Sequence, residues 1–337
     1  MKIVIATPLY PPEVGGPAYY AFNLEQALVA QGVKVRVISY RFERKLPPGL
    51  RHILFFLRSL TVVPGSDGII VLDTFSVGLP AGLAALIFRT PIIVRVGGDF
   101  LWEQYVARRQ EATTLSSFYL APRFFTIKEK IIFKLTKIFL HWATVIVFST
   151  KWQADIWQQP YNISPAKIKY IENFYGHKKN TSPRPYPQDF ILVWAGRDIF
   201  LKNLTLLQEA FALAQVEQPA LKLQIVTNVR QAELFQVLDK ASALILPSLS
   251  DISPNIVLEG LMFNLPMIVT KEMGLKDRLQ DTVLYIDSLD ISDIKEKILL
   301  LASRAGYEQG AKAAANFSFT HSYEAIAEEF INLFSKL

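Results

Sequence analysis

Two basic side chains in the second half of the chain, Arg197 and Lys202, follow a short apolar run that ends in glycine, Val193-Trp194-Ala195-Gly196. Such a run is typical of a strand, so we expect both cations near the strand's carboxyl end. A guanidinium and an ammonium at such a place suit a diphosphate, especially one that gains charge as a leaving group. Seen alone, however, two basic residues near the start of a helix are more often simply solvated.

An acidic residue, Asp251, stands in a second segment of the same kind. We expect a buried strand to end at Pro247, a loop to carry Asp251, and a helix to begin near Pro254. Proline is favoured at the first helical position, and Ser253 before it suits a cap. Asp251 by itself is also compatible with an ordinary loop acid.

The predicted helix carries a second acid, Glu259, eight positions after Asp251. The unpaired amides of the first turn, near Asn255 and Ile256, would face a phosphate group. Glu259 has apolar neighbours, so we expect it to be partly buried and to need a hydrogen-bond partner, a role that two sugar hydroxyls would fill. The alternative for Glu259 is an ion pair within the helix.

Paired glycines, Gly15 and Gly16, follow the first strand-like run of the chain within the segment YPPEVGGP. Glycines let the backbone approach a ligand, and the amino terminus of the following helix offers free amides to an anion. The spacing is neither Gly-x-Gly-x-x-Gly nor a P-loop, which disfavours generic dinucleotide and ATP sites. An ordinary strand-to-helix turn remains the alternative.

Bulk composition limits the class of protein. The 337 residues suffice for two domains, and 51% are hydrophobic and 20% charged, as in globular proteins. Cysteine is absent and the four histidines are scattered, so we expect no metal site. The net charge of +6 favours anionic partners such as nucleotides or phospholipid headgroups. Nucleic acid is disfavoured because no motif interleaves aromatic and basic residues.

No run of 18 apolar residues occurs and no signal peptide is visible, so we expect a cytoplasmic protein that is soluble or peripheral to the inner face of the membrane. Two segments, Arg51–Leu60 and Phe124–Trp142, mix apolar with basic residues. Either segment suits contact with an anionic membrane. The alternative for Phe124–Trp142 is a helix packed on the core with a solvated lysine face.

The elements that position these residues alternate between short Val- and Ile-rich runs and helix-length segments, which predicts parallel sheets built of βαβ units. The predicted strands are Lys2–Ala6, Val33–Ser39, Gly68–Leu72, Ile92–Val96, Thr144–Phe148, Phe190–Ala195, Lys222–Val226, Ala243–Pro247, Met267–Thr270 and Val283–Ile286.

The series falls into two doubly wound domains. We expect a first domain over residues 1–175, a proline-bearing linker over 176–188 and a second domain over 189–320. A closing helix over 321–337 would pack back on the first domain. Ligands of open α/β sheets bind at the carboxyl ends of the strands, so the two domains should face a common cleft.

Together these segments resemble the retaining GT-B glycosyltransferases, in particular glycosyltransferase family 4, over nearly the whole chain. The resemblance rests on YPPEVGG, AGRDIFLKN, TVIVFSTKWQADIW, IKYIENFY and LPSLSDISPNIVLEGLMFNLPMIVT. It implies a nucleotide-sugar donor as substrate, without a cofactor and without a metal. No Asp-x-Asp motif is present, which disfavours the metal-dependent GT-A class.

The resemblance also implies roles for single residues. Arg197 and Lys202 would bind the donor diphosphate, and Glu259 would hold the ribose hydroxyls. Asp251 would contact the transferred sugar. The backbone after Asp251, at Pro254, Asn255 and Ile256, would hold the phosphate or sugar, and Gly15 and Gly16 would let donor and acceptor meet.

This chain departs from the family at four places. Asp251 stands where Glu is usual, and Asp99 stands near a usual His, where it would make a polar contact to the donor sugar. Asn264 replaces a usual Gly, although asparagine tolerates the left-handed conformation. The interval Thr227–Ser242 lacks a strand-helix unit, so the second domain is expected to be trimmed.

The leading hypothesis is a hexosyltransferase that transfers a sugar from UDP- or GDP-sugar, with retention, to a glycan or lipid-linked acceptor in polysaccharide or glycolipid synthesis. The alternative is a non-catalytic subunit of the same fold that binds a nucleotide sugar or glycan. An epimerase acting on a UDP-sugar is a further, less favoured alternative.

Overall fold

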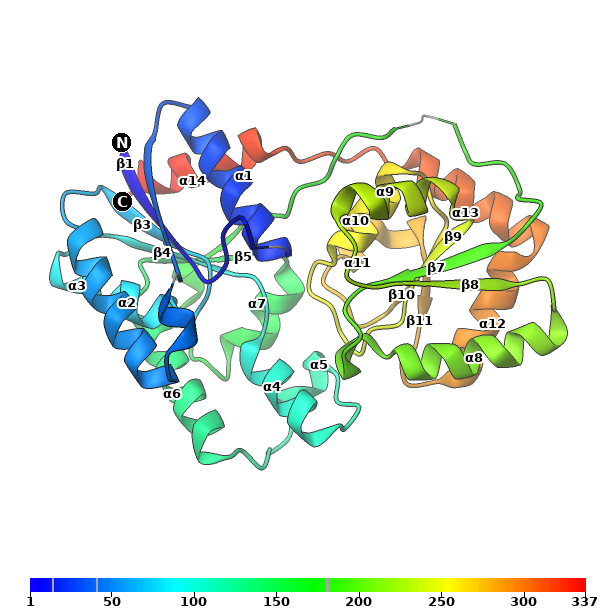
Figure 1. Ribbon diagram of the computed structural model, residues 1–337, viewed down its shortest axis with the longest axis horizontal. Helices are drawn as coiled ribbons and strands as arrows, with labels where there is room; N and C mark the ends of the chain where they lie inside the picture. Colours follow the sequence, from blue (N-terminus) through cyan, green and yellow to red (C-terminus); the bar gives the residue numbers. More distant parts are fainter. Residues whose placement is uncertain (14, 41, 180–181) are drawn as a thin grey trace. The chain divides into compact units, whose positions relative to one another are not determined.

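The computed structural model describes residues 1–13, 15–40, 42–179 and 182–337. The chain divides into two compact units (Figure 1). The first comprises Met1–Leu101, Arg123–Phe174 and His321–Leu337, and the second comprises Trp102–Pro122 and Tyr175–Thr320. Each unit holds one parallel sheet with helices, which confirms the predicted α/β class of Rossmann-like doubly wound domains.

The sheet of the first unit has six parallel strands, in the spatial order β2 (Lys34–Ser39), β1 (Lys2–Thr7), β3 (Gly68–Val71), β4 (Ile92–Val96), β5 (Val145–Phe148) and β6 (Ile168–Tyr170). Branched Val and Ile side chains favour the extended conformation and fill the space between sheet and helices. β3, β4 and β5 are buried along their whole length, as expected for a sheet covered on both faces.

Helices cover both faces of this sheet. α1 (Gly16–Ala30) packs against α14 (Tyr323–Phe334), whereas α2 (Pro48–Val62) packs against α3 (Gly78–Ile87), and α3 against α6 (Ile127–Trp142). In Figure 1, α1 and α14 lie on one side of the strands, and α2, α3 and α6 on the other. Thr126 and Glu129 form a capping box that fixes the start of α6.

The sheet of the second unit has five parallel strands, in the order β11 (Leu284–Ile286), β10 (Met267–Thr270), β9 (Ala243–Leu246), β7 (Ile191–Ala195) and β8 (Lys222–Val226). Its long helices are α8 (Leu204–Glu217), α9 (Gln231–Lys240), α10 (Asn255–Met262), α12 (Ile291–Ala302) and α13 (Arg304–Asn316). The chain moves outward from β7 to β8 and then returns to β9 on the other side of β7. The strand order therefore reverses between β7 and β9.

The predicted strands are confirmed to within one residue at each end. α9 alone joins β8 to β9, in the interval where the sequence predicts a trimmed domain. α13 is not predicted. Its one local sequence signal is Ser303, the N-cap residue, whose side chain accepts a hydrogen bond from the Gly306 amide. The remaining helical elements of the described chain are η1 (Phe42–Lys45), α4 (Phe100–Arg109), α5 (Leu115–Phe118), α7 (Lys151–Gln158), η2 (Pro165–Lys167), η3 (Phe200–Lys202), α11 (Lys276–Leu279) and η4 (Gln280–Thr282).

The division into units differs from the predicted first domain at one segment. Trp102–Pro122 lies within the expected range 1–175, yet it belongs to the second unit. The chain changes unit between Phe174 and Tyr175 and again between Thr320 and His321, close to the predicted ends. α14 then packs on α1 within the first unit.

The predicted linker over 176–188 belongs to the second unit and packs against it, while its positions 180 and 181 lie outside the described residues. The Lys178 ammonium donates to Asn264 Oδ1 at 2.6 Å and to the Ala314 carbonyl. Burial lowers the pKa of Lys178 to about 8. Arg184 donates to the Phe263 carbonyl at 3.2 Å. These bonds give the segment fixed partners on the second unit, unlike a freely solvated connection.

Gly68 in β3 tests the docking of the closing helix. A Cβ built there would lie 2.1 Å from the Phe334 ring of α14, so Gly68→Ala must displace that ring or the helix end. We expect a loss of unfolding free energy of about 1–3 kcal/mol, as is usual for overpacking a core. Gly49→Ala is the matched control, because nothing lies within 4 Å of a Cβ there. Equal stability of both variants in urea unfolding would contradict this packing.

Candidate functional site

The loops that follow β7 and β9 lie together because these two strands are neighbours, with Leu192 opposite Ala243 and Val193 opposite Leu244. The carboxyl ends of parallel strands meet at one edge of a sheet, and the point where strand order reverses is where open α/β sheets bind ligands. The first loop carries Arg197 and Lys202, and the second carries Asp251. The structure thus brings two of the predicted segments to the reversal point of the second sheet.

Asn203 ties the two loops together. It adopts a left-handed conformation, with φ of 54°, at the end of η3 and the start of α8. Its side-chain amide donates to the carbonyls of Pro247 at 3.2 Å and Ser288 at 2.6 Å. A backbone bond from the Leu249 amide to the Leu201 carbonyl, at 3.0 Å, joins the same loops. Lys202 stands between Leu201 and Asn203 in the sequence, so these bonds fix its backbone on both sides.

Lys202 and Asp251 form an ion pair in which the lysine Nζ lies 2.5 Å from Asp251 Oδ2. Both side chains are mostly buried, at 24% and 17% exposure. A pair shielded in this way keeps more of its electrostatic attraction than a surface pair does. The residues predicted to bind a diphosphate and a sugar are therefore direct partners of each other in the structure.

The backbone of Asp251 is fixed by a short parallel bridge to Met273. The Asp251 amide donates to the Glu272 carbonyl at 2.9 Å, and the Gly274 amide donates back to the Asp251 carbonyl at 3.1 Å. The carboxylate is one methylene shorter than the glutamate of the resembling family, so its reach depends on where this bridge holds the backbone.

α10 begins one residue later than the sequence predicts. Pro254 is the N-cap instead of the first helical residue, and Ser253 precedes it. The Val257 amide makes the first helical bond, to the Pro254 carbonyl at 3.1 Å. The amides of Asn255 and Ile256 precede that bond, in the part of a helix that favours an anion. Asn255 is exposed and Ile256 partly so.

Glu259 lies on α10 and is partly buried. Gln231, the first residue of α9, donates from its Nε2 to Glu259 Oε1 at 3.1 Å. Burial raises the pKa of Glu259, and the bond from Gln231 offsets part of that rise. The structure does not show the alternative, an intrahelical ion pair, because the partner of the Glu259 carboxylate is a neutral amide from another helix.

Arg197 occupies the loop after β7, five residues before Lys202, and its side chain is exposed. Within the described ranges, its guanidinium makes neither an ion pair nor a side-chain hydrogen bond. An exposed guanidinium with no internal partner remains available to an anionic ligand.

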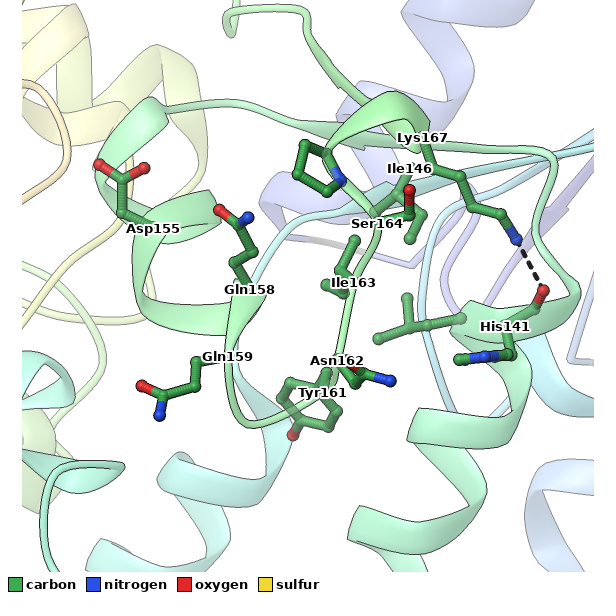
Figure 2. Close-up of a pocket in the computed structure, with 12 residues that line it drawn as sticks. His141, Ile146, Asp155, Gln158, Gln159, Tyr161, Asn162, Ile163, Ser164 and Lys167 are labelled. Carbon is green, nitrogen blue, oxygen red and sulfur yellow. Dashed lines mark hydrogen bonds between the residues drawn. The ribbon is translucent and has the colours of Figure 1, made fainter.

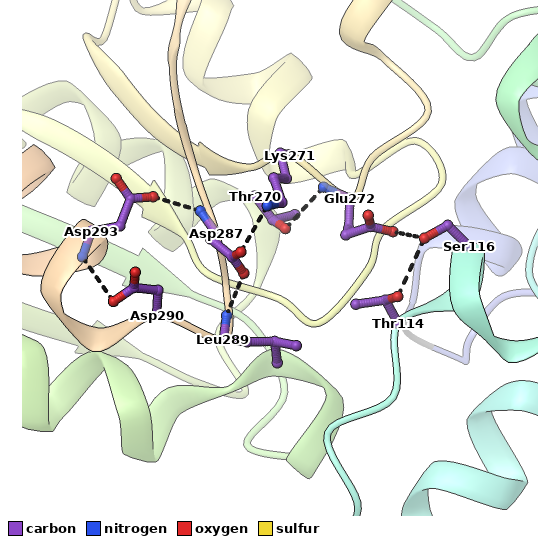
Figure 3. A network of polar contacts seen from close by, with 9 residues as sticks. All are labelled: Thr114, Ser116, Thr270, Lys271, Glu272, Asp287, Leu289, Asp290 and Asp293. Atoms are coloured by element: carbon purple, nitrogen blue, oxygen red, sulfur yellow. Dashed lines mark hydrogen bonds and ion pairs between the residues drawn. The ribbon is translucent and has the colours of Figure 1, made fainter.

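A segment that sequence reasoning missed borders Asp251. Within the second unit, the Leu115 amide donates to Ser250 Oγ at 2.8 Å, and Ser116 Oγ donates to Glu272 Oε2 at 2.5 Å. Figure 3 shows Ser116 directed at Glu272 and Thr114 in contact with Ser116, beside a second polar cluster in which Lys271 pairs with Asp287 at 2.7 Å. The contacts join residues more than 130 positions apart, so no local pattern could reveal them.

Gly15 and Gly16, by contrast, lie in the first unit at the start of α1, and position 14 lies outside the described residues. Gly15 has φ of 146° and ψ of 158°, a conformation that is essentially restricted to glycine. The requirement is conformational, because a Cβ there would meet no atom closer than 3.9 Å. Glu13, just before, pairs with Arg44 and fixes the loop.

Asp99 also belongs to the first unit, where it is only 1% exposed. Its Oδ2 accepts a hydrogen bond from the Trp157 indole at 2.8 Å. This bond ties the end of β4 to α7. As observed, the carboxylate has a structural partner and does not face open solvent, so its predicted contact to a donor sugar has no support from this geometry.

A pocket of about 630 Å³ lies elsewhere on the first unit, between the end of α6, α7 and the loop before β6 (Figure 2). Its lining includes Asp155, Gln158 and Asn162, and Lys167 donates across one side to the His141 carbonyl at 2.7 Å. The lining side chains visible in Figure 2 point in different directions. The pocket therefore lacks the converging groups of the loops after β7 and β9.

Among the described residues, no group of three or more His, Asp or Glu side chains is arranged to hold a metal ion. In the same residues, no helix is both long and apolar enough to cross a membrane.

Comparison with known proteins identifies the fold. No family profile and no curated protein sequence matches the chain. Sucrose-phosphate synthase from Thermosynechococcus elongatus is similar with a TM-score of 0.68 at 13% identity, over 100% of this chain and 98% of that one. HepE from Anabaena, in complex with UDP, has a TM-score of 0.65 at 12% identity, over 100% of both chains.

A third solved structure is WaaG, a glycosyltransferase involved in lipopolysaccharide biosynthesis, with a TM-score of 0.67 at 13% identity over 99% of both chains. These structures share the GT-B fold, and the chain has that fold along its whole length. At such low identity the likeness establishes the architecture alone.

Asn203 gives a test of how the site loops are held. Asn203→Gly keeps the left-handed backbone but removes both side-chain bonds, which should lower the unfolding free energy by about 1–3 kcal/mol. Asn203→Ala should cost about 1 kcal/mol more, because alanine is strained at this φ. Asn228→Ala is the control, since Asn228 is exposed and has φ of 55°. A cost for Asn203→Gly no larger than that for Asn228→Ala would contradict the role.

Proposed function

We propose that this protein is a glycosyltransferase that transfers a hexose-type sugar from a nucleoside diphosphate sugar, with retention at the anomeric carbon. One observation carries the proposal: at the strand reversal of the second sheet, the Lys202–Asp251 pair lies beside the amino terminus of α10, the helix that carries Glu259. A cation, the first amides of a helix and a partly buried carboxylate are the groups that a diphosphate, a sugar and a ribose require.

In the proposed reaction the acceptor hydroxyl attacks the anomeric carbon as the bond from that carbon to the β-phosphate oxygen breaks. The acceptor proton passes to the leaving phosphate oxygen. Lys202, Arg197 and the first amides of α10 would stabilise the negative charge that collects on the diphosphate. Asp251 would orient the transferred sugar, and Glu259 would accept hydrogen bonds from the ribose hydroxyls.

The similar structures support an order in which to test donor bases. The structures of HepE that resemble this chain contain UDP or UDP-glucose. We therefore propose UDP-sugars as the first donors to test and GDP-sugars as the second. The acceptor we propose is a glycan or a lipid-linked saccharide. A thermal-shift screen of UDP, GDP and their sugars tests the donor without needing an acceptor, and no shift with any nucleotide would contradict the proposal.

We also propose that transfer needs neither a metal nor a bound cofactor, as the family resemblance implies. The readout is turnover of the donor identified by the screen, before and after treatment with EDTA. Loss of turnover that is restored by Mg²⁺ or Mn²⁺ would overturn metal independence and leave the fold assignment untouched.

The first site prediction concerns Glu259. Replacing Glu259 with Ala should weaken UDP binding roughly 10- to 150-fold, because hydrogen bonds to a charged group contribute about 1.5–3 kcal/mol. Calorimetric titration with UDP measures this. Glu296→Ala, at an exposed acid of α12, is the matched control. Equal affinities for the two variants would rule out the ribose role.

Glu259 also predicts a pH dependence. Burial raises its pKa in the free protein, and ribose hydroxyls would favour the ionised form by donating to it. Affinity for UDP should therefore be full above that raised pKa and fall as the pH drops through it. Glu259→Gln should bind more weakly and lose this dependence. A wild-type affinity that stays constant into the mildly acidic range would contradict the assignment.

The second site prediction concerns turnover. Lys202→Met should lower kcat about 10²–10³-fold with a smaller effect on donor affinity, since the lysine acts on charge that develops in the transition state. Lys240→Met, at an exposed lysine of α9, is the control. The double variant Lys202→Met/Asp251→Asn separates two explanations. Recovery of kcat in the double variant would mean that Lys202 only neutralises Asp251.

The non-catalytic alternative rests on the same ion pair, because Asp251 pairs with the lysine that the proposed reaction needs. Binding of a nucleotide sugar without hydrolysis or transfer, across a panel of glycan and lipid-linked acceptors, would favour a binding subunit. Anomeric configuration in the product, read from proton NMR couplings, decides whether transfer proceeds with retention.

A further inference from the structure

The outward surface of α2 is apolar, which is the reverse of an ordinary surface helix. Ile53 is 57% exposed, and Leu50 and Leu57 on the same helical face are exposed as well. Over its described positions 49–62, the exposed residues are Gly49, Leu50, Ile53, Leu57 and Thr61, and none is charged.

The charged residues of α2 turn inward because they have partners there. Arg58 pairs with Glu43, which is fully buried, and donates to the Ser39 carbonyl at 3.1 Å. Arg51 lies over the Tyr40 ring, 5.8 Å from its centroid. The apolar outward face is therefore fixed by the internal bonding of the helix.

α3 repeats this arrangement beside α2. Its sequence, GLPAGLAALI, contains no charged residue. Ile87 is 56% exposed, and Leu83 and Leu86 are exposed with it. α3 packs against both α2 and α6, so it is the middle one of these three helices. A Cβ at Gly82 would lie 2.5 Å from the Phe139 ring, so α3 and α6 are closely packed.

α6 adds both apolar and basic groups. Ile127 is 79% exposed and Ile131 is also exposed, while Lys128, Lys130 and Lys134 are exposed between and beyond them. The one acidic residue in the sequences of the three helices is Glu129, which is buried and bonded within the capping box of α6. The surface formed by α2, α3 and α6 thus carries apolar side chains and positive charge without an exposed acid.

We propose that this surface, the α2–α3–α6 face, rests on an anionic lipid membrane. The exposed Leu and Ile side chains would enter the boundary between headgroups and acyl chains, and the lysines of α6 would contact anionic headgroups. A second copy of the chain is a poorer occupant, because the exposed lysines of α6 would be buried without an acidic partner: none of the three helices exposes an acid over its described positions. The attachment is peripheral and does not depend on the proposed transfer reaction.

The test uses the full-length protein and sedimentation with lipid vesicles, in the absence of donor and acceptor. The protein should sediment with vesicles of phosphatidylcholine that contain phosphatidylglycerol, and far less with phosphatidylcholine alone. Sedimentation should fall as salt increases, since headgroup attraction is screened. Absence of binding to the anionic vesicles would overturn the proposal, whatever the outcome of the donor assays.

Two sets of variants separate the apolar from the electrostatic contribution. The triple variant Ile53→Gln/Leu57→Gln/Ile87→Gln should lower partitioning of the protein onto vesicles at least about tenfold, because each substitution removes hydrocarbon that would enter the membrane. Lys130→Gln/Lys134→Gln should lower binding to anionic vesicles about fivefold per lysine, with little change on neutral ones. Circular dichroism checks that each variant is folded, which we expect for exposed positions.

Matched controls lie away from this face. Val29→Gln replaces an exposed apolar residue of α1, and Lys312→Gln/Lys336→Gln removes two exposed lysines from α13 and the carboxyl terminus. Both controls should bind vesicles as the wild type does. Equal binding by folded wild type and both face variants would overturn the proposal. So would an oligomer, seen in size-exclusion chromatography, that the apolar variants dissolve and that binds no vesicles.

Discussion

The parallel pairing of β7 with β9 is the constraint on which the candidate site depends. The two strands are about 50 positions apart in sequence, yet their pairing brings Lys202 and Asp251 within 2.5 Å. A slip of one residue would turn every side chain of β7 to the opposite face of the sheet. Trp194, which is fully buried in the core formed with α8 and α12, would then lose its place. Core packing thus fixes the position of the polar groups at the strand ends.

The Lys202–Asp251 pair also sets the electrostatics of the candidate site. A mostly buried lysine or carboxylate alone would be costly, and each supplies the charge that the other needs. An entering diphosphate would share the lysine, and the hydroxyls of a sugar would satisfy the carboxylate. Lys202 and Asp251 would thus exchange each other for the diphosphate and the sugar. Because both exchanges involve the same donor molecule, the pair favours a ligand that carries both groups. The short side chain of Asp251 keeps the pair close to the loop backbone, which the bridge to Met273 holds.

Much of the fold was predictable because its signals are local. Runs of Val and Ile define the predicted strands to within one residue, although the short β6 was not among them. Asn264 takes the left-handed conformation, with φ of 53°, that its side chain tolerates. The candidate residues of the loops after β7 and β9 were predictable for the same reason. The membership of Trp102–Pro122 in the second unit was not, because it depends on bonds such as that from Leu115 to Ser250. Gln231 as the partner of Glu259 was equally hidden, since glutamine at a helix start carries no specific signal.

The orientation of α2 shows why a pattern of residue types can leave the outward face undecided. Apolar residues occur on every side of this helix, so periodicity alone does not choose which side meets the sheet. The choice follows from Glu43, a buried acid that precedes the helix and holds Arg58 inward. Breaking that pair would leave a buried carboxylate without its cation, which costs more than exposing a leucine. The charge that is satisfied inside the first unit is therefore the reason that its apolar neighbours face outward.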